Sequence, residues 1–95
     1  MEININCDLG EKSELHSNHN DPKLLGIVNS ASVACGFHAG DEETMNQIIK
    51  ISKENKVSIG AHPSFNDREN FGRKRINLNS KEIKKLIIDQ YNILQ

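Results

Sequence analysis

Short apolar runs recur along this 95-residue chain, and each is followed by a turn of small or polar residues. Between residues 3 and 7, isoleucine and cysteine alternate with asparagine, which is the period-2 pattern of a β-strand. Residues 31–35 and 57–61 are two further runs, ended by Gly36 and by His62 respectively. The pattern therefore predicts three short strands.

The stretches after these runs have the spacing of amphipathic helices. Asp21, Asp41 and Ser80 each precede apolar residues at helical spacing, and such side chains commonly cap helices. Pro22 also suits the first position of a helix. We predict a short helix from Asp21, helices at residues 41–55 and 80–95, and polar loops at residues 11–20 and 63–79.

The alternation of strands and helices predicts an α/β fold with parallel strands, which either are covered on both faces or line a barrel. Three strands cannot close a barrel, which usually needs about 250 residues. Gln95 also follows the apolar pair Ile93 and Leu94 with no helix stop signal. We therefore expect residues 1–95 to be the N-terminal part of a single (β/α) barrel domain, apparently truncated, with its first three parallel strands and their helices.

Composition excludes several classes of partner. The net charge is −1, which indicates neither nucleic acid nor an anionic membrane surface as a partner. The apolar runs are too short to span a bilayer, and the start lacks the regions of a signal peptide, so we expect a cytoplasmic location. Cys7 and Cys35 are expected to be buried free thiols.

Side chains suited to catalysis follow all three predicted strands. Asp8 and Glu11 come after the first, His38 lies in a glycine-rich turn after the second, and His62 ends the third. Ligands of parallel α/β folds bind outside the carboxyl ends of the strands, so we expect Asp8, His38 and His62 to converge there. Paired carboxylates could hold a metal or activate water; alternatively, Asp8 accepts backbone N–H groups and Glu11 is solvated.

Two other polar clusters are less informative. His16 and His19 lie in a polar loop, and we interpret them as a solvated stretch and not as a metal site. An arginine near Phe71 could clamp a carboxylate or phosphate, or belong to a solvated loop face. The chain has no Walker-type glycine-rich loop, so we expect no nucleotide site of its own. The basic residues around Phe71 are Arg68, Arg73, Lys74 and Arg75.

Four motifs together resemble the LamB/YcsF family. They are residues 6–11 (NCDLGE), 30–41 (SASVACGFHAGD), 59–63 (IGAHP) and 71–73 (FGR), in the family's order and at compatible spacing. The similarity spans essentially the whole chain but only the N-terminal portion of a family member. It implies a (β/α) barrel related to the polysaccharide-deacetylase type. It also implies ATP-dependent opening of 5-oxoproline to glutamate by the A subunit of a 5-oxoprolinase, together with partner subunits B and C.

The resemblance marks Asp8 as an active-site position and places Arg73 within a family motif. We expect Asp8 or His62 to transfer protons and His38 to polarise or orient the substrate. We expect Glu11 and Arg73 to bind the substrate, and Arg73 would hold its carboxylate. Residues 12–20 depart from the family pattern, which weakens any transfer of function to them. Ser64, where the family more often has glycine, is a mild departure that could alter the turn beside His62.

Two alternatives stay open. Asp8, His38 and His62 would also make a metal-binding set, as in related deacetylase barrels, so a metal-dependent hydrolase acting on C–N bonds is the second enzyme class. The resemblance does not establish a metal; the cofactor it implies is ATP, and a divalent metal is an additional possibility. The third hypothesis is an inactive truncated fragment, or a chain that only contacts a partner subunit.

Overall fold

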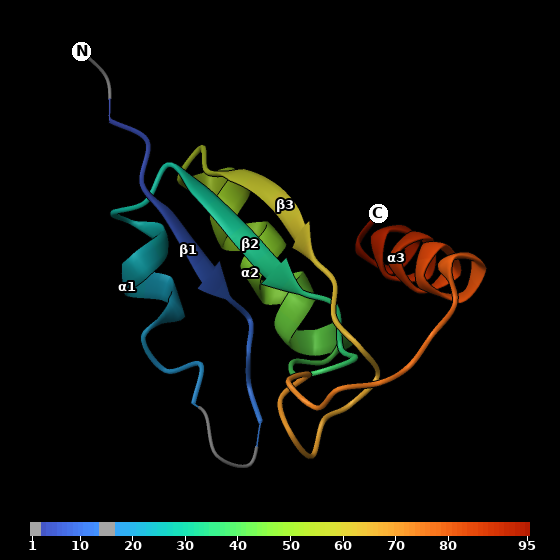
Figure 1. Ribbon diagram of the computed structural model, residues 1–95. Coiled ribbons are helices and arrows are strands. Elements are labelled where there is room, and N and C mark those ends of the chain that lie inside the picture. Colours follow the sequence, from blue (N-terminus) through green and yellow to red (C-terminus); the bar gives the residue numbers. More distant parts are fainter. Residues whose placement is uncertain (1–2, 14–16) are drawn as a thin grey trace.

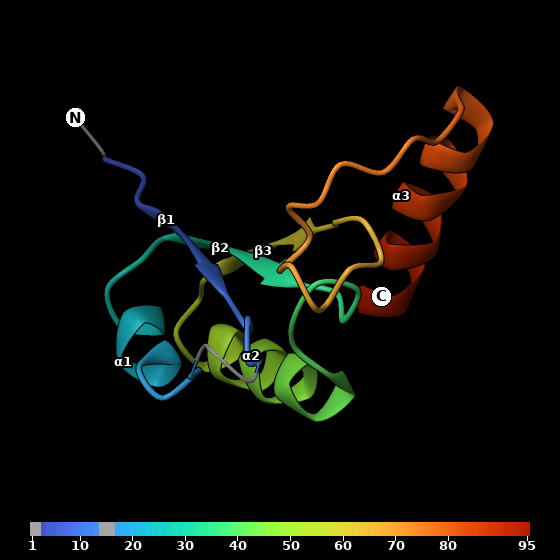
Figure 2. The ribbon, with the colours of Figure 1, turned by 60° about the horizontal axis from the view of Figure 1, so that its bottom comes forward.

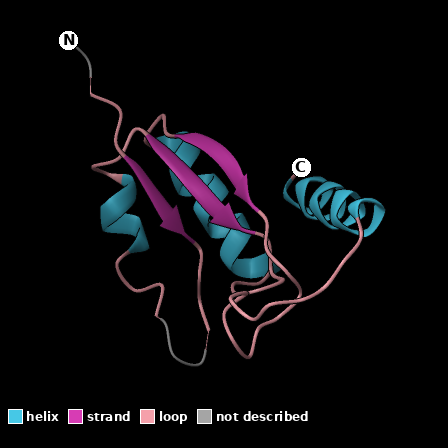
Figure 3. Cartoon of the chain, viewed as in Figure 1, coloured by secondary structure: helices cyan, strands magenta, loops and turns pink. Residues whose placement is uncertain are grey.

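The computed structural model describes residues 3–13 and 17–95. Strands and helices alternate along this part of the chain, as the sequence pattern predicts (Figures 1 and 3). The elements are β1 (Asn6–Leu9), α1 (Asp21–Leu25), β2 (Ser30–Ala34), α2 (Glu42–Glu54), β3 (Ser58–His62) and α3 (Ser80–Leu94).

The three strands form one parallel sheet in the order β1-β2-β3, which confirms the predicted parallel pairing. Leu9 is paired in register with Val33, and Val33 with Ala61. All three strands therefore end at the same edge of the sheet, where Figure 1 shows the three arrowheads together. This edge receives the loops that carry the predicted site residues.

One face of the sheet is apolar and is covered by helices. Figure 2 shows α1 and α2 on the same side of the sheet, and Leu94 near the end of α3 packs against the same core. Removing these side chains from water stabilises the fold by about 25 cal/mol for each Å² of apolar surface buried. The buried core residues are Leu9, Leu25, Val28, Ala31, Val33, Met45, Ile48 and Val57.

The opposite face of the sheet is polar. Asn6 is registered with Ser30, and Asp8 with Ser32, so these four side chains share this face. The Ser30 hydroxyl donates to Asn4 Oδ1 at 3.0 Å, and Asn6 Nδ2 donates to Ser32 Oγ at 3.5 Å. Within the described residues the helices cover one face of the sheet, and the polar face is left accessible.

Several predicted boundaries are wrong by a few residues. The first strand was predicted at residues 3–7 but runs from Asn6 to Leu9, because its ladder with β2 starts at Asn6 and Leu9 is needed in the core. Asp8 therefore lies within β1 and not in the following turn. The other two strands, predicted at 31–35 and 57–61, are each shifted by one residue.

The predicted helix caps are confirmed in one case of three. Asp41 caps α2, since its Oδ1 accepts the Thr44 N–H at 2.7 Å. Hydrogen bonding from the Thr44 side chain, and secondly from its backbone N–H, lowers the pKa of the Asp41 carboxyl. At α3 the cap is Asn79 and not Ser80, because Asn79 Oδ1 accepts the N–H of Glu82. Asp21 does not cap α1; it lies inside the helix and bonds elsewhere.

Asp21 instead joins α1 to the end of β1. Its Oδ2 accepts the Gly10 N–H at 2.9 Å, in a buried position. Burial raises the pKa of the Asp21 carboxyl above its ordinary value of 3.8, and the Gly10 hydrogen bond opposes this only in part. The contact fixes the turn that leads into Glu11.

The two cysteines are free thiols, as predicted; Cys35 is buried and Cys7 is half-buried. Burial raises the pKa of each thiol above its ordinary value of 9.0. A raised pKa leaves little thiolate at neutral pH, so neither thiol is suited to act as a nucleophile.

The loop after β2 packs tightly against the turn after β1. Gly40 has a φ of +81°, and a Cβ atom at this position would overlap the carbonyl oxygen of Gly10. The Gly40 N–H also donates to the Lys12 carbonyl at 2.7 Å. This contact of backbone against backbone holds the segment carrying Glu11 beside the loop carrying His38.

We expect Gly40→Ala to destabilise the protein more than Gly36→Ala. Both glycines have positive φ, +81° and +91°, which costs an L-residue about 1–2 kcal/mol. Only at Gly40 does the added Cβ meet backbone; at Gly36 no described atom lies within 4 Å of it. Denaturant unfolding measures both losses, and equal losses would contradict the proposed close approach.

Asp21→Asn should change the pH dependence of stability. Because the folded-state pKa of Asp21 is raised, its stabilising contribution is greatest below pH 3.8 and is lost as pH rises through the folded pKa. The variant should therefore gain stability relative to the wild type as the pH rises from 3.8 through the folded-state pKa of Asp21. Asp21→Ala should lose about 1–3 kcal/mol, since the Gly10 N–H then lacks its acceptor. A pH-independent difference between wild type and Asp21→Asn would disprove this interpretation.

Candidate functional site

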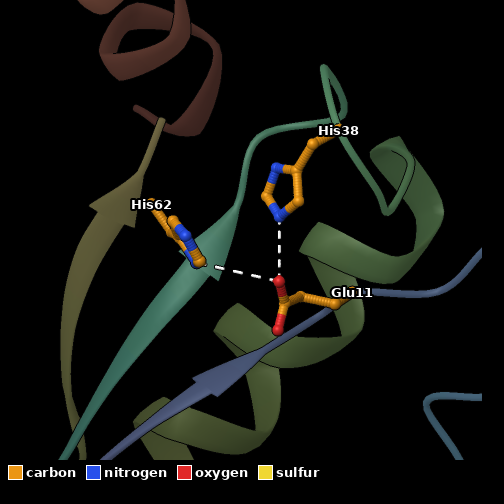
Figure 4. Close-up of side chains that lie close together, drawn as sticks. All are labelled: Glu11, His38 and His62. Atoms are coloured by element: carbon orange, nitrogen blue, oxygen red, sulfur yellow. Dashed lines mark hydrogen bonds and ion pairs between the residues drawn. The ribbon is translucent and has the colours of Figure 1, made fainter. Parts of the chain in front are cut away.

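Three strand ends bring one carboxylate and two imidazoles together. Glu11 follows β1, His38 lies in the loop after β2, and His62 is the last residue of β3 (Figure 4). Glu11 Oε2 lies 2.8 Å from His38 Nε2 and 4.0 Å from His62 Nδ1. The centroids of the two imidazole rings are 4.8 Å apart. The shorter distance is a hydrogen bond, and the longer one is not.

Asp8 lies beside this group. Its Oδ1 is 3.8 Å from His62 Nδ1, and its side chain is 55% exposed. The predicted convergence of Asp8, His38 and His62 at one edge of the sheet is therefore confirmed. Glu11, not Asp8, is the carboxylate in hydrogen-bond contact with a histidine, and it is not the solvated side chain considered from the sequence. The catalytic roles of these residues stay predictions.

His38 is buried, with 2% of its surface exposed. The ring of Phe71 meets it edge-on, with centroids 5.1 Å apart and an interplanar angle of 77°. Its Nε2 faces Glu11, whereas its Nδ1 has no hydrogen-bond partner among the residues that the structure describes. The hydrogen bond to Glu11 therefore orients the ring with its Nε2 atom toward the other site residues.

Arg68 fastens the loop that carries His38. One of its terminal nitrogens donates to the Gly36 carbonyl at 2.9 Å and to the Gly40 carbonyl at 2.7 Å. The neighbouring N–H of Asp67 donates to the Phe37 carbonyl. From the sequence, Arg68 belonged to a basic cluster that could clamp an anion or form a solvated loop face. Its structural role was missed, because nothing local indicates that its side chain reaches a turn so distant along the chain.

Gln90 holds the segment that follows β3 in place. This α3 residue is fully buried, and its amide makes two hydrogen bonds to the backbone of Ser64. Gln90 Oε1 accepts the Ser64 N–H at 2.8 Å, and Gln90 Nε2 donates to the Ser64 carbonyl at 2.6 Å. Sequence reasoning missed this residue, although a polar side chain three residues after Ile87, within the apolar stripe of α3, was a usable signal.

Of the remaining predicted positions, Arg73 lies at the pocket and His19 does not. Arg73 lines the pocket, and its guanidinium carbon lies 5.8 Å from the centroid of the Phe71 ring. His19 is exposed in the turn before α1, and His16 lies outside the described residues. The pocket has a volume of about 230 Å³. Its lining comprises Asp8, Glu11, His38, His62, Pro63, Ser64, Phe71, Gly72 and Arg73.

The arrangement combines groups that exchange protons with one that binds anions. Carboxylates and imidazoles can act as general acids and bases, and an arginine can bind a carboxylate. Glu11, His38 and His62 also place one donor atom each within 4.8 Å of the other two, which is close enough to share a metal ion. No helix in the described part of the chain is long and apolar enough to cross a bilayer.

The fold and site define an α/β protein with a histidine–carboxylate site at the carboxyl ends of parallel strands. The sequence matches the LamB/YcsF family over residues 3–95, and the chain belongs to this family. This confirms the resemblance inferred from the four motifs.

Named relatives and a solved structure agree with this assignment. The chain is 44% identical over 95 residues to the A subunit of the 5-oxoprolinase of Staphylococcus aureus (strain bovine RF122 / ET3-1), covering 100% of this chain and 38% of that protein. It is 45% identical over 94 residues to the corresponding protein of Staphylococcus carnosus (strain TM300), of which it covers 37%. The crystal structure of a lactam utilization protein from Thermus thermophilus is similar, with a TM-score of 0.90 and 32% identity over 99% of this chain and 38% of that one.

Arg68→Ala should loosen the loop at residues 36–40. Losing two hydrogen bonds from a charged donor at an exposed position should cost about 1–2 kcal/mol. Amide hydrogen exchange should show reduced protection within this loop, and Glu69→Ala, at the exposed neighbouring position, is the matched control. Equal protection in the two variants would show that Arg68 does not hold the loop.

Proposed function

We propose that this chain is part of the A subunit of an ATP-dependent 5-oxoprolinase, which cleaves 5-oxo-L-proline to L-glutamate together with subunits B and C. Its family, and the names of the relatives it resembles, support this proposal. The solved neighbour is named for lactam utilization, and 5-oxoproline is a lactam. The cytoplasmic location stays a prediction.

The observation that carries the proposal is the lining of the pocket. 5-Oxoproline is a small ring with a cyclic amide and a carboxylate. Asp8 and His62 offer acid–base groups for the amide, and Arg73 offers a guanidinium for the carboxylate. The volume of about 230 Å³ suits a ligand of this size.

The chemistry requires activation, because an amide carbonyl is a poor electrophile. In the proposed route, ATP phosphorylates the lactam oxygen, and a water molecule then forms a bond to the activated carbonyl carbon. The ring C–N bond breaks as the nitrogen gains a proton, and a second water releases phosphate and leaves glutamate. The sequence has no Walker-type loop, so we assign ATP to the complex with the partner subunits.

Among the site residues, Asp8 is best placed to accept a proton from the attacking water. Its side chain is 55% exposed and lines the pocket, and its Oδ1 lies 3.8 Å from His62 Nδ1. His38 is buried and hydrogen-bonded to Glu11, so its proposed role is to orient Glu11 and the substrate. In this proposal the solvent-exposed residue transfers the proton, and the buried residue positions its neighbours.

We further propose that the sheet is the first part of one (β/α) barrel, of the type found in polysaccharide deacetylases. The distribution of side chains supports this, since helices cover the apolar face and the polar face of the sheet would line the interior. The chain spans 38% of the length of its S. aureus relative, so residues 1–95 would supply only some of the strands of such a barrel.

The alternative is a metal-dependent hydrolase that acts on acyclic C–N bonds, as deacetylases do. The cluster of Glu11, His38 and His62 supports this candidate, since such donors suit a catalytic metal. Release of acetate from acetylated amines, without ATP, would favour it over 5-oxoproline cleavage.

Replacing His62 by alanine should lower ATP-dependent glutamate formation from 5-oxoproline at least about a hundredfold, the typical contribution of an acid–base residue. His38→Ala should lower it as well, because Glu11 then loses the hydrogen bond that orients it. The assay uses the complete protein with subunits B and C. His19→Ala is the matched control, because His19 is exposed and does not line the pocket. Near-normal turnover in both site variants, or a large loss in His19→Ala, would refute the assignment.

A further inference from the structure

The group formed by Glu11, His38 and His62 has the composition of a metal site. One donor atom from each residue lies within 4.8 Å of the other two, and the three residues come from three different strand ends (Figure 4). His38 is buried, and the side chains of His62 and Glu11 are 31% and 21% exposed. The donors therefore line the pocket and are partly shielded from water.

Hydrogen bonds within this group do not satisfy all of its buried nitrogen atoms. The 2.8 Å contact between Glu11 and His38 is a hydrogen bond, but His62 Nδ1 is 4.0 Å from Glu11 and 3.8 Å from Asp8. His62 Nδ1 is buried and has no hydrogen-bond partner within residues 3–13 and 17–95. A buried polar atom without a partner is unfavourable, because it has lost its water and gained nothing in exchange. A cation between the three donors would supply that partner.

The separations fit metal–ligand bonds. Tetrahedral bonds of about 2.1 Å place neighbouring donor atoms about 3.4 Å apart. The two distances to Glu11, 2.8 Å and 4.0 Å, lie on either side of this value, and all three donor atoms lie within 4.8 Å of one another. Shifts of about 1 Å in the donor atoms would bring all three pairs to this separation. Two imidazole nitrogens and one carboxylate oxygen suit Zn²⁺ and other divalent transition metals better than Ca²⁺ or Mg²⁺.

We propose that Glu11, His38 and His62 bind one divalent transition-metal ion, of the chemistry of Zn²⁺, and leave an open coordination position toward the pocket. Three protein ligands with one open position are typical of catalytic rather than structural zinc. This set differs from the sequence-based one by replacing Asp8 with Glu11. Asp8 stays beside the site, where it can accept a proton from a molecule at the open position.

The proposal concerns metal binding only and does not depend on which substrate occupies the pocket. An ion at this position could hold a water molecule or a carbonyl oxygen, and either would serve the hydrolysis of an amide or a lactam. Binding is therefore measured without substrate, ATP or partner subunits.

The experiment is calorimetric titration of ZnCl₂ into the intact protein after removal of metal with a chelator. We expect one equivalent to bind, and Glu11→Gln and His62→Ala to weaken the affinity at least about tenfold. His19→Ala should bind as the wild type does. Glu11→Gln keeps the shape of the side chain, and its circular dichroism and unfolding midpoint verify that it folds. These two variants decide the outcome even where the buried His38→Ala variant does not fold.

Two results would overturn the proposal. One is a wild-type affinity for Zn²⁺ no tighter than that of His62→Ala and Glu11→Gln, and the other is an equal loss in His19→Ala. The 5-oxoprolinase assay is separate from this titration. Zinc binding in a protein that does not cleave 5-oxoproline would count against the proposed function alone, and cleavage by a protein that binds no zinc would count against the metal alone.

Discussion

The parallel register of three short strands is the constraint on which the site depends. Because Leu9, Val33 and Ala61 are paired in one row, the chain leaves the sheet three times at the same edge. Each exit carries a functional side chain, so residues 27 positions apart, such as Glu11 and His38, come within 2.8 Å. A shift of one residue in a strand would turn its side chains to the other face and disperse the group.

The register of the strands does not determine the conformation of the loops. Contacts outside the sheet hold these loops in place. The backbone of Gly40 lies against that of Gly10, and Asp21 binds the Gly10 N–H from α1. Arg68 and Gln90, both later in the chain, hold the exits of β2 and β3. Residues outside the pocket thus hold the backbone of the loops that carry the site side chains. Such support keeps reactive groups in a defined geometry.

Glu11 connects the two functional interpretations of the site. As a hydrogen-bond acceptor it orients His38, and as a ligand it would complete a set of three donors with His38 and His62. Asp8 lies on the polar face of the sheet, and its side chain is more exposed than that of Glu11. Two carboxylates three positions apart near the end of β1 therefore have different environments, and a difference in environment is what lets two carboxylates take different roles.

The sequence by itself determined the order of strands and helices, their parallel pairing and the convergence of Asp8, His38 and His62. These follow from local periodicity and from the rule that parallel strands end at one edge. Tertiary structure decided that Glu11 bonds to His38, that Asp21 binds Gly10 instead of capping α1, and that Arg68 and Gln90 support the site. These contacts join residues 11 to 32 positions apart, and such distances depend on packing, which no local pattern encodes.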